Sequence, residues 1–177
     1  MKKAGKKVFL SYAEADREPA RRLANHLRDA GYEVWDPEQE ILPGSQWTSV
    51  LQKGLEAAEA MVVLLSPDAV RSRWVTHEIE YALGAEHLSG RLIPVVVRPT
   101  REIPWFVDSL KIPYQPRIEL QIRKLQSMLR AKGVAAPPRG AAAAKPARKT
   151  EPRATARSRT PAAQKKALGQ FRARATP

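Results

Sequence analysis

Glu78 is the residue of this chain whose type and surroundings best suit chemistry. It lies in the segment Ser72–Leu83, where helical spacing would place Trp74, Glu78 and Tyr81 on one face. A carboxylate at the edge of a core, beside aromatic rings, is partly shielded from water, so its charge acts strongly on a developing cation. Such a group suits the breaking of a bond to a sugar. The adjoining helix positions form an apolar stripe that consists of Val75, Ile79, Ala82 and Leu83.

Two familiar catalytic patterns do not fit this helix. Glu80 is only two positions from Glu78 and would point to the opposite side, so these acids are not the paired carboxylates of a glycosidase. Tyr81 stands where a zinc-binding H-E-x-x-H motif beginning at His77 needs its second histidine, and no metal site is predicted. The local pattern also fits a solvated glutamate on an ordinary amphipathic helix. The rest of the chain must decide between that interpretation and an active carboxylate.

Short apolar runs alternate with segments of helical spacing, which predicts an α/β fold with a parallel sheet covered by helices on both faces. Pro94 suggests that the fourth run starts late or lies near a sheet edge. The expected strands are Val8–Leu10, Glu33–Trp35, Met61–Leu65 and Leu92–Val97, with a short fifth at Ile112–Tyr114. The expected helices cover residues 20–30, 47–58, 73–87 and 118–129, and Ser66–Asp68 has the pattern of a helix start.

Three connections that follow strands should converge at one edge of this sheet, because open α/β sheets bind ligands at the carboxyl ends of their strands. They are Ser11–Tyr12, Asp36–Ser45 and Ser66–Trp74, and Glu78 lies just behind the last of them. The chain lacks the signatures G-x-G-x-x-G, G-x-x-x-x-G-K-[ST] and G-x-S-x-G. Their absence weighs against a Rossmann dehydrogenase, a P-loop NTPase and an α/β-hydrolase.

The composition indicates one domain of ordinary size. The chain has 177 residues, of which 43% are hydrophobic, and it has no cysteine. It can therefore form no disulfide, thiolate nucleophile or zinc-thiolate site, and the expected location is the cytoplasm. The basic N-terminus is followed by an apolar run that ends at Leu10, too short for a signal peptide or a membrane span. Neither secretion nor membrane insertion is expected.

The basic character of the chain belongs to residues 131–177. This segment holds twelve Lys/Arg and one acid, so it carries +11 of the formal net charge of +13. It is built mostly of Ala, Pro, Lys and Arg, cannot bury a core and is expected to be a disordered tail. Its cations suit salt-sensitive binding to nucleic acid or another polyanion. A solubilising tail without a dedicated ligand is an equally open alternative.

Four segments in order resemble the signature boxes of a Toll/interleukin-1 receptor (TIR) domain of the bacterial type. The match spans about residues 6–130 and implies a flavodoxin-like fold, with a parallel sheet of about five strands flanked by helices. No single box is specific, but the four occur in the right order on the right predicted elements. They are Val8–Tyr12, Val34–Asp36 with Ile41–Gly44, Val62–Ser66, and Ser72–Glu78.

The resemblance implies an enzyme. Many TIR domains cleave NAD⁺ at the bond between nicotinamide and ribose, with one glutamate in a W-x-x-x-E pattern, which here assigns Glu78 as the catalytic residue. NAD⁺ is then the substrate, and no cofactor or metal is needed. The same matching assigns the loop around Ile41 to the family's BB loop, which gates the pocket and takes part in self-association. The implied substrate-binding residues are Ser11, Tyr12, Asp36, Ile41, Leu42, Gly44 and Trp74.

The chemistry that the resemblance implies is physically reasonable. Nicotinamide is positively charged in NAD⁺ and leaves as a neutral molecule, so the barrier lies in the ribosyl cation that a nearby carboxylate stabilises. Capture by water gives ADP-ribose, and capture by the adenine ring gives a cyclic form. Trp74 and Tyr12 would supply surfaces for stacking, although an aromatic at such a position is as often core packing. Trp105 would be a further aromatic at the site or at an assembly face.

Other functions stay open at this point. The chain has Ala13-Glu14 where some family members carry basic residues, which leaves the phosphate contacts of a nucleotide unassigned. Many TIR domains are non-enzymatic adaptors that act by self-association, but an adaptor usually lacks the glutamate that this chain keeps. A third possibility is chemistry on another nucleotide. The interpretation that we carry forward is NAD⁺ cleavage in bacterial immune signalling, with TIR–TIR self-association.

Overall fold

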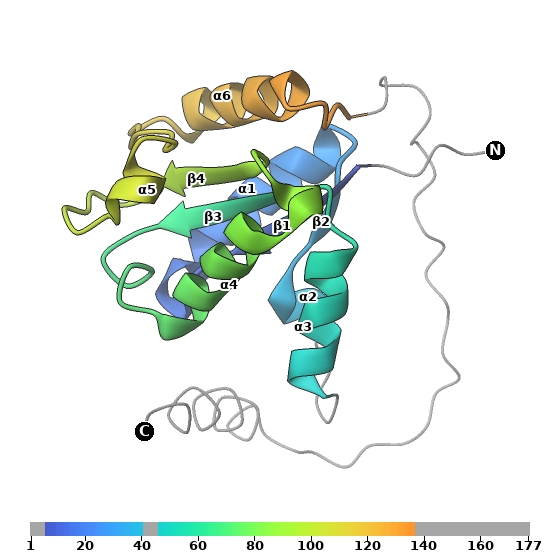
Figure 1. The fold of residues 1–177 in the computed structure, drawn as a ribbon. Helices are drawn as coiled ribbons and strands as arrows, with labels where there is room; N and C mark the ends of the chain where they lie inside the picture. Colours follow the sequence, from blue (N-terminus) through green and yellow to red (C-terminus); the bar gives the residue numbers. More distant parts are fainter. Residues whose placement is uncertain (1–5, 41–45, 137–177) are drawn as a thin grey trace, which may run out of the picture. The chain divides into compact units, whose positions relative to one another are not determined.

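A computed structural model describes residues 6–40 and 46–136 of the chain. Its centre is a sheet of four parallel strands, in the order β2-β1-β3-β4 (Figure 1). This parallel sheet with flanking helices confirms the predicted fold class. The predicted site residues Ile41, Leu42 and Gly44 lie outside the described residues, as does the tail beyond residue 136. The strands are β1 (Lys7–Ser11), β2 (Glu33–Trp35), β3 (Ala60–Leu65) and β4 (Leu92–Val96).

The fifth predicted strand is reduced to one bridge. Ile112 pairs with Val95 on the outer side of β4, where its N–H donates to the Pro94 carbonyl at 2.7 Å and its carbonyl accepts from the Val96 N–H at 2.9 Å. Proline has no N–H to give to a longer ladder at this position. Of the strands in the described part of the chain, β4 is thus the outermost on this side, as Pro94 predicted.

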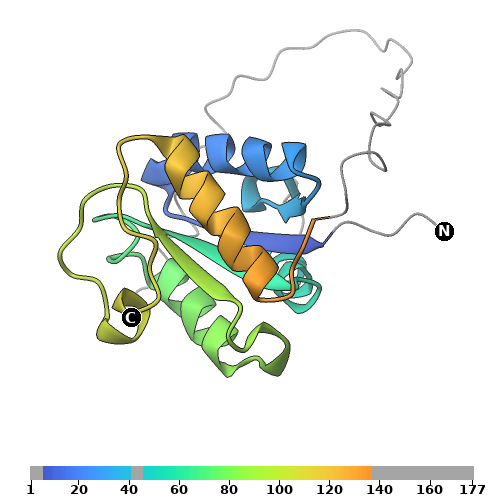
Figure 2. The ribbon, with the colours of Figure 1, turned by 90° about the horizontal axis from the view of Figure 1, so that it is seen from above.

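Helices cover both faces of the sheet (Figures 1 and 2). On one face lie α1 (Arg17–Asp29) and α6 (Ile118–Ala131), whose leucines pack against Leu10 and Val62 of the strands. On the other face lie α3 (Trp47–Glu56) and α4 (Arg73–Gly84), which pack against Phe9 and Val63. The alternation of side chains along each strand divides the core into these two halves. The short elements are η1 (Glu14–Asp16), α2 (Pro37–Glu40), η2 (Glu86–Leu88) and α5 (Trp105–Asp108).

Local sequence explains where the main helices end. Gly31 follows α1 with a φ of 93°, a left-handed conformation that glycine adopts without steric cost. The α6 helix continues to Ala131, and Val134 beyond it is buried in the core. The folded part therefore extends past residue 130, where the sequence predicted the tail to begin. Within the described residues, no helix combines the length and the apolar character that crossing a membrane requires.

Three sequence predictions about the α4 region were wrong in detail. Ser66 starts a single turn, closed by the Val70 N–H donating to its carbonyl at 3.1 Å, and not a helix. The helix begins after Ser72, whose Oγ accepts from the Val75 N–H at 3.4 Å. It stops at Gly84 because Ala85 is extended, so residues 73–87 do not form one helix. Leu83 is 49% exposed and does not belong to the buried stripe.

Candidate active site

Glu78 lies on the second turn of α4 and is only 3% exposed. Sequence reasoning placed it at the edge of the core, but the packing of α4 against the sheet buries it more completely than that. Ser11, the last residue of β1, is fully buried and donates a hydrogen bond from Oγ to Glu78 Oε2. The carboxyl end of β1 and the helix α4 thus meet at a hydroxyl–carboxylate pair. The solvated-glutamate alternative for Glu78 is excluded.

Tyr12 and Asp36 form a second buried pair. The Tyr12 hydroxyl donates to Asp36 Oδ1 at 2.7 Å, and Asp36 directly follows β2. Because neighbouring residues of an extended chain point to opposite sides, Ser11 turns towards α4 while Tyr12 joins the half of the core formed with α1 and α6. The structure therefore brings the predicted site residues together as two pairs that diverge from the same strand end.

Trp74 lies one turn before Glu78 on α4, as the helical spacing predicted. It is half-buried and packs against the half of the core that contains Val75 and Ile79. Tyr81 packs against the same half from the following turn. Part of the Trp74 side chain therefore contributes to core packing, and part of it is accessible to solvent.

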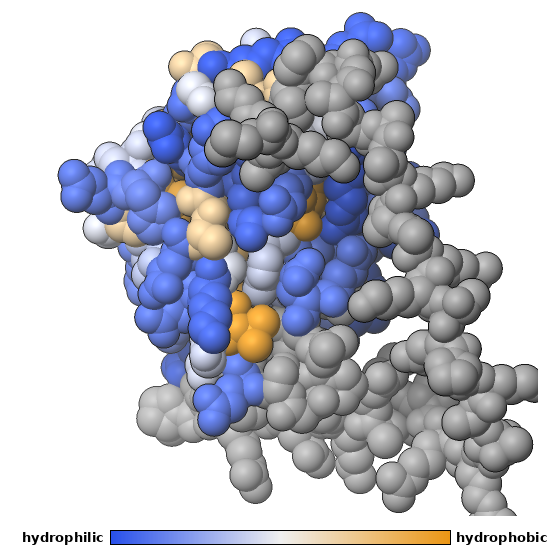
Figure 3. Space-filling view, turned by 90° about the vertical axis from the view of Figure 1, so that its right-hand side faces the viewer, coloured by the Kyte–Doolittle hydropathy of each residue, from blue (hydrophilic) through white to orange (hydrophobic). Residues whose placement is uncertain are grey.

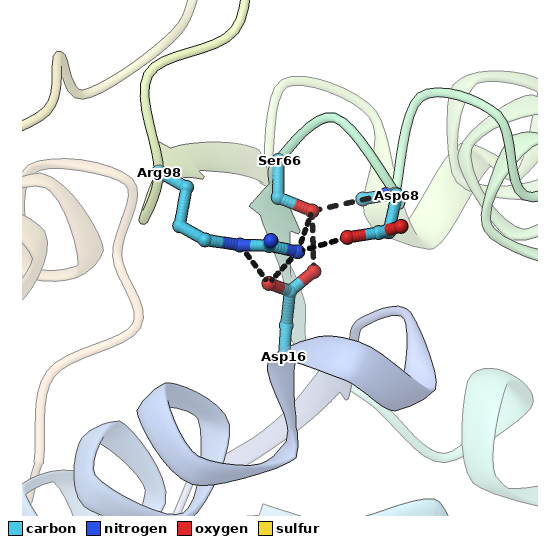
Figure 4. A network of polar contacts seen from close by, with 5 residues as sticks. Asp16, Ser66, Asp68 and Arg98 are labelled. Atoms are coloured by element: carbon cyan, nitrogen blue, oxygen red, sulfur yellow. Dashed lines mark hydrogen bonds and ion pairs between the residues drawn. The ribbon is translucent and has the colours of Figure 1, made fainter.

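A network of charged groups next to the site was missed by sequence reasoning (Figure 4). Asp16 is fully buried in η1, and Arg98 Nε donates to its Oδ1 at 2.9 Å. Arg98 Nη2 lies 2.8 Å from the same oxygen and completes the ion pair. Ser66 Oγ donates to Oδ2 of the same carboxylate, and Arg98 also donates to Asp68. The segments that follow β1, β3 and β4 are therefore joined at one carboxylate.

The hydrogen bonds of this network favour the charged form of Arg98. The pKa of the Arg98 guanidinium is raised above its ordinary value. The hydrogen bond to Asp68 is the largest cause, and the hydrogen bond and charge attraction to Asp16 act in the same direction. Arg98 is therefore charged at every physiological pH. One sequence signal could have indicated this network. Asp16, Ser66 and Arg98 each follow a predicted strand, at the sheet edge where the strand ends were expected to converge.

Glu78 lines neither of two cavities that open on the described surface. One, the Tyr12 cavity, has a volume of about 530 Å³ and includes Tyr12 and Asp36 together with Arg17 and Arg21. The other, the 99–114 cleft, has about 480 Å³ and lies between the turn after β3 and the connection that follows β4. The side of the molecule seen in Figure 3 is mostly hydrophilic where it is described, with small hydrophobic areas. In the described part of the chain, no group of three or more His, Asp or Glu side chains is arranged to hold a metal ion.

Comparison with known proteins decides the family, because a sequence model of the TIR domain matches residues 8–133. The chain belongs to the TIR domain family. Its likeness to the crystal structure of the TIR domain of the Toll-related receptor TRR-2 from Hydra magnipapillata has a TM-score of 0.57 at 22% identity. That likeness covers 71% of this chain and 97% of the other, and it confirms the fold. The predicted TIR resemblance is thereby confirmed.

Curated bacterial relatives of this TIR domain are named as enzymes. The chain is 30% identical over 97 residues to the 2′ cyclic ADP-D-ribose synthase BtTIR of Bacteroides thetaiotaomicron, which covers 53% of this chain and 33% of that protein. It is 29% identical over 90 residues to the NAD(+) hydrolase PdTIR of Paracoccus denitrificans, covering 50% and 30% respectively. The matched part of the chain thus spans about a third of the length of these relatives.

Proposed function

We propose that this TIR domain cleaves NAD⁺ between nicotinamide and ribose, with Glu78 as the catalytic carboxylate. The observation that carries the proposal is the burial of Glu78 on α4, where Ser11 from the end of β1 holds its carboxylate by a hydrogen bond. The names of BtTIR and PdTIR support the same class of reaction. An enzyme of this kind would be an NAD⁺ nucleosidase, a hydrolase that acts on an N-glycosidic bond.

In the proposed reaction the bond between the anomeric carbon and the nicotinamide nitrogen breaks, and nicotinamide leaves with the electron pair as a neutral molecule. The positive charge then lies on the ribose ring. A unit charge about 4 Å from a carboxylate at a partly shielded site is stabilised by about 4 kcal/mol, several times more than in bulk water. Water adds to the anomeric carbon and loses a proton, which gives ADP-ribose; attack by the substrate's own adenine gives a cyclic product.

Ser11 has a positioning role in this proposal. Its hydroxyl fixes the orientation of the Glu78 carboxylate, so that the charge is already in place when the cation develops. Tyr12 and Asp36 border the nucleotide in the same proposal, since they line a polar cavity beside the same strand end. The further proposed substrate contacts are Trp74 on α4, and Ile41, Leu42 and Gly44 in the loop outside the described residues.

The test is chromatographic analysis of NAD⁺ products from the full chain, at high concentration or artificially clustered. Clustering matters because the proposal includes TIR–TIR self-association as the condition for activity. We expect Glu78→Gln, which keeps the size of the side chain, to reduce nicotinamide release at least 100-fold, because it removes the charge that the transition state needs. Glu80→Gln is the matched control, since Glu80 is exposed on the same helix.

The possible results separate the enzyme from the adaptor. Full turnover by Glu78→Gln would remove this carboxylate from the mechanism. Absence of nicotinamide release by clustered, folded wild-type protein would instead favour an adaptor that acts only by self-association. Cleavage of a different nucleotide in a substrate panel would leave the proposed role of the Glu78 carboxylate in place but would replace NAD⁺ as the substrate. Immune signalling, a cytoplasmic location and polyanion binding by residues 131–177 remain predictions that this assay does not address.

A further inference from the structure

The connection between β4 and α6 exposes large apolar side chains. Trp105 is 83% exposed, and Leu110 and Tyr114 in the same connection are 40% and 42% exposed. The Trp105 ring makes an edge-to-face contact with Phe106, with centroids 5.8 Å apart and planes at 88°. Single exposed apolar residues are normal on a soluble domain, whereas several in one connection indicate a binding surface.

The same connection forms one wall of the 99–114 cleft, and the turn after β3 forms the other. Its walls are largely apolar and include Val70, Val96 and Ile103. Its lining also includes the cations Arg71, Arg101 and Lys111, and one acid, Glu102. Lys111 is already paired with Asp108. Neither Arg71 nor Arg101 has an ion pair with any residue that the structure describes.

We propose that the 99–114 cleft, Trp105 and Tyr114 form a docking surface for a polypeptide segment that carries acidic side chains beside a large apolar one. Tryptophan, tyrosine and arginine are the residue types that dominate the binding energy of protein interfaces. The apolar walls accept the partner's apolar side chain, and its carboxylates bind Arg71 and Arg101, whose guanidinium groups can hold a carboxylate through two parallel hydrogen bonds.

The charges of the surface favour a polypeptide over a nucleic acid. A polyphosphate backbone is held by a row of cations along its length. Here Glu102 and Asp108 interrupt the cations, and among the described residues that line the cleft Arg71 and Arg101 are the cations without an ion pair. A small nucleotide is also disfavoured, since sheets of this kind bind such ligands where the strand order reverses, between β1 and β3, whereas this cleft lies beside β3 and β4.

Selection of random 12-residue peptides by display on the full-length protein tests the proposal. Peptides that also bind a Trp105→Ala/Arg101→Ala double variant are removed, which discards any that bind the basic segment 131–177. We expect the remaining sequences to combine Asp or Glu with Trp, Phe or Leu. A selection that yields no peptides, or peptides without acidic residues, overturns the proposal.

Affinities of a selected peptide for single variants then locate the site. Trp105→Ala is expected to weaken binding roughly 30-fold, because an exposed tryptophan of this kind is an interface anchor. Arg101→Ala is expected to weaken binding roughly tenfold and to reduce its salt dependence. The matched controls are Leu120→Ala and Arg123→Ala, which remove exposed residues of the same kinds from α6.

Equal loss of affinity in the controls would overturn the proposal, since binding would then depend on total charge or hydrophobicity. Two other occupants are also tested directly. If the wild type sediments as a dimer and Trp105→Ala sediments as a monomer, the surface binds a second copy of this chain. If labelled dT12 binds the wild type but not Trp105→Ala, the surface binds a nucleic acid. Trp105→Ala is expected to fold, because so little of this side chain is buried; Trp105→Lys provides a second variant.

Discussion

Two buried carboxylates at the same edge of the sheet are held in different ways. Asp16 is bonded by the Arg98 guanidinium and by Ser66, and it joins the segments after three strands. Glu78 receives its described bond from the hydroxyl of Ser11. A carboxylate bonded to a guanidinium has its charge neutralised locally, which suits a structural joint. In the proposed function, the Ser11 hydroxyl instead orients the Glu78 carboxylate towards a substrate cation. The comparison assigns Asp16 to stability and, under the proposed function, Glu78 to catalysis.

The largest expected effect on stability comes from Arg98→Met. This change leaves the Asp16 carboxylate buried without its cation, which costs about 2–3 kcal/mol of unfolding free energy. The cost is below the roughly 3–5 kcal/mol of a fully buried pair because the Arg98 side chain is 42% exposed. Chemical denaturation beside Arg123→Met, an exposed arginine on α6, measures it. By contrast Glu78→Gln should leave stability within about 1 kcal/mol of the wild type. Equal destabilisation by the two variants would erase the distinction between the carboxylates.

The two serines give the sharpest form of the comparison. Ser11→Ala removes the described bond to Glu78, and we expect kcat to fall roughly tenfold with little change in KM, because the carboxylate loses its fixed orientation. Ser66→Ala removes the equivalent bond to Asp16 and should lower stability by about 1 kcal/mol without affecting kcat. The measurements are steady-state kinetics on clustered protein and denaturant melts. If Ser66→Ala reduced kcat as much as Ser11→Ala, Asp16 would belong to the catalytic unit.

Asp68→Asn should have the smallest effect. Its side chain is 47% exposed, so its ion pair with Arg98 is screened by water and contributes at most about 1 kcal/mol. Thermal melts at low and high salt measure this contribution, which should decrease as salt rises. A loss as large as that of Arg98→Met would show that Asp68, and not the buried Asp16, is the main partner of the guanidinium.

The sequence predicted the elements well and the polar contacts poorly. Strands such as Glu33–Trp35 and the helix that carries Glu78 follow from periodic patterns that can be read within a short window. The bonds between Asp16, Ser66 and Arg98 join residues 50 and 82 positions apart in the chain, and no local spacing records them. Ser66 shows the limit of local patterns. Its sequence pattern predicted the start of a helix, but the segment forms one turn, and the Ser66 hydroxyl donates to Asp16.

The assignment of the candidate site comes from the TIR resemblance and remains a prediction. Local spacing alone favoured a solvated Glu78, and only the family pattern singled this residue out from its neighbours on the helix. The contact with Ser11 crosses 67 positions of the chain and required the fold. Because side chains alternate along a strand, Ser11 and Tyr12 had to point to opposite sides of the sheet and so contact different carboxylates. No sequence pattern indicated that Asp36 is the partner of Tyr12.

The single bridge at Ile112 has a consequence for how copies of this domain can meet. The Pro94 carbonyl and the Val96 N–H on the outer side of β4 are engaged by Ile112 in the following connection, and Pro94 has no N–H to offer there. A foreign strand could not extend the sheet at this border without first displacing that connection. Neighbouring molecules that approach from this direction must recognise one another through side chains, and the identity of those side chains then decides which neighbours are accepted.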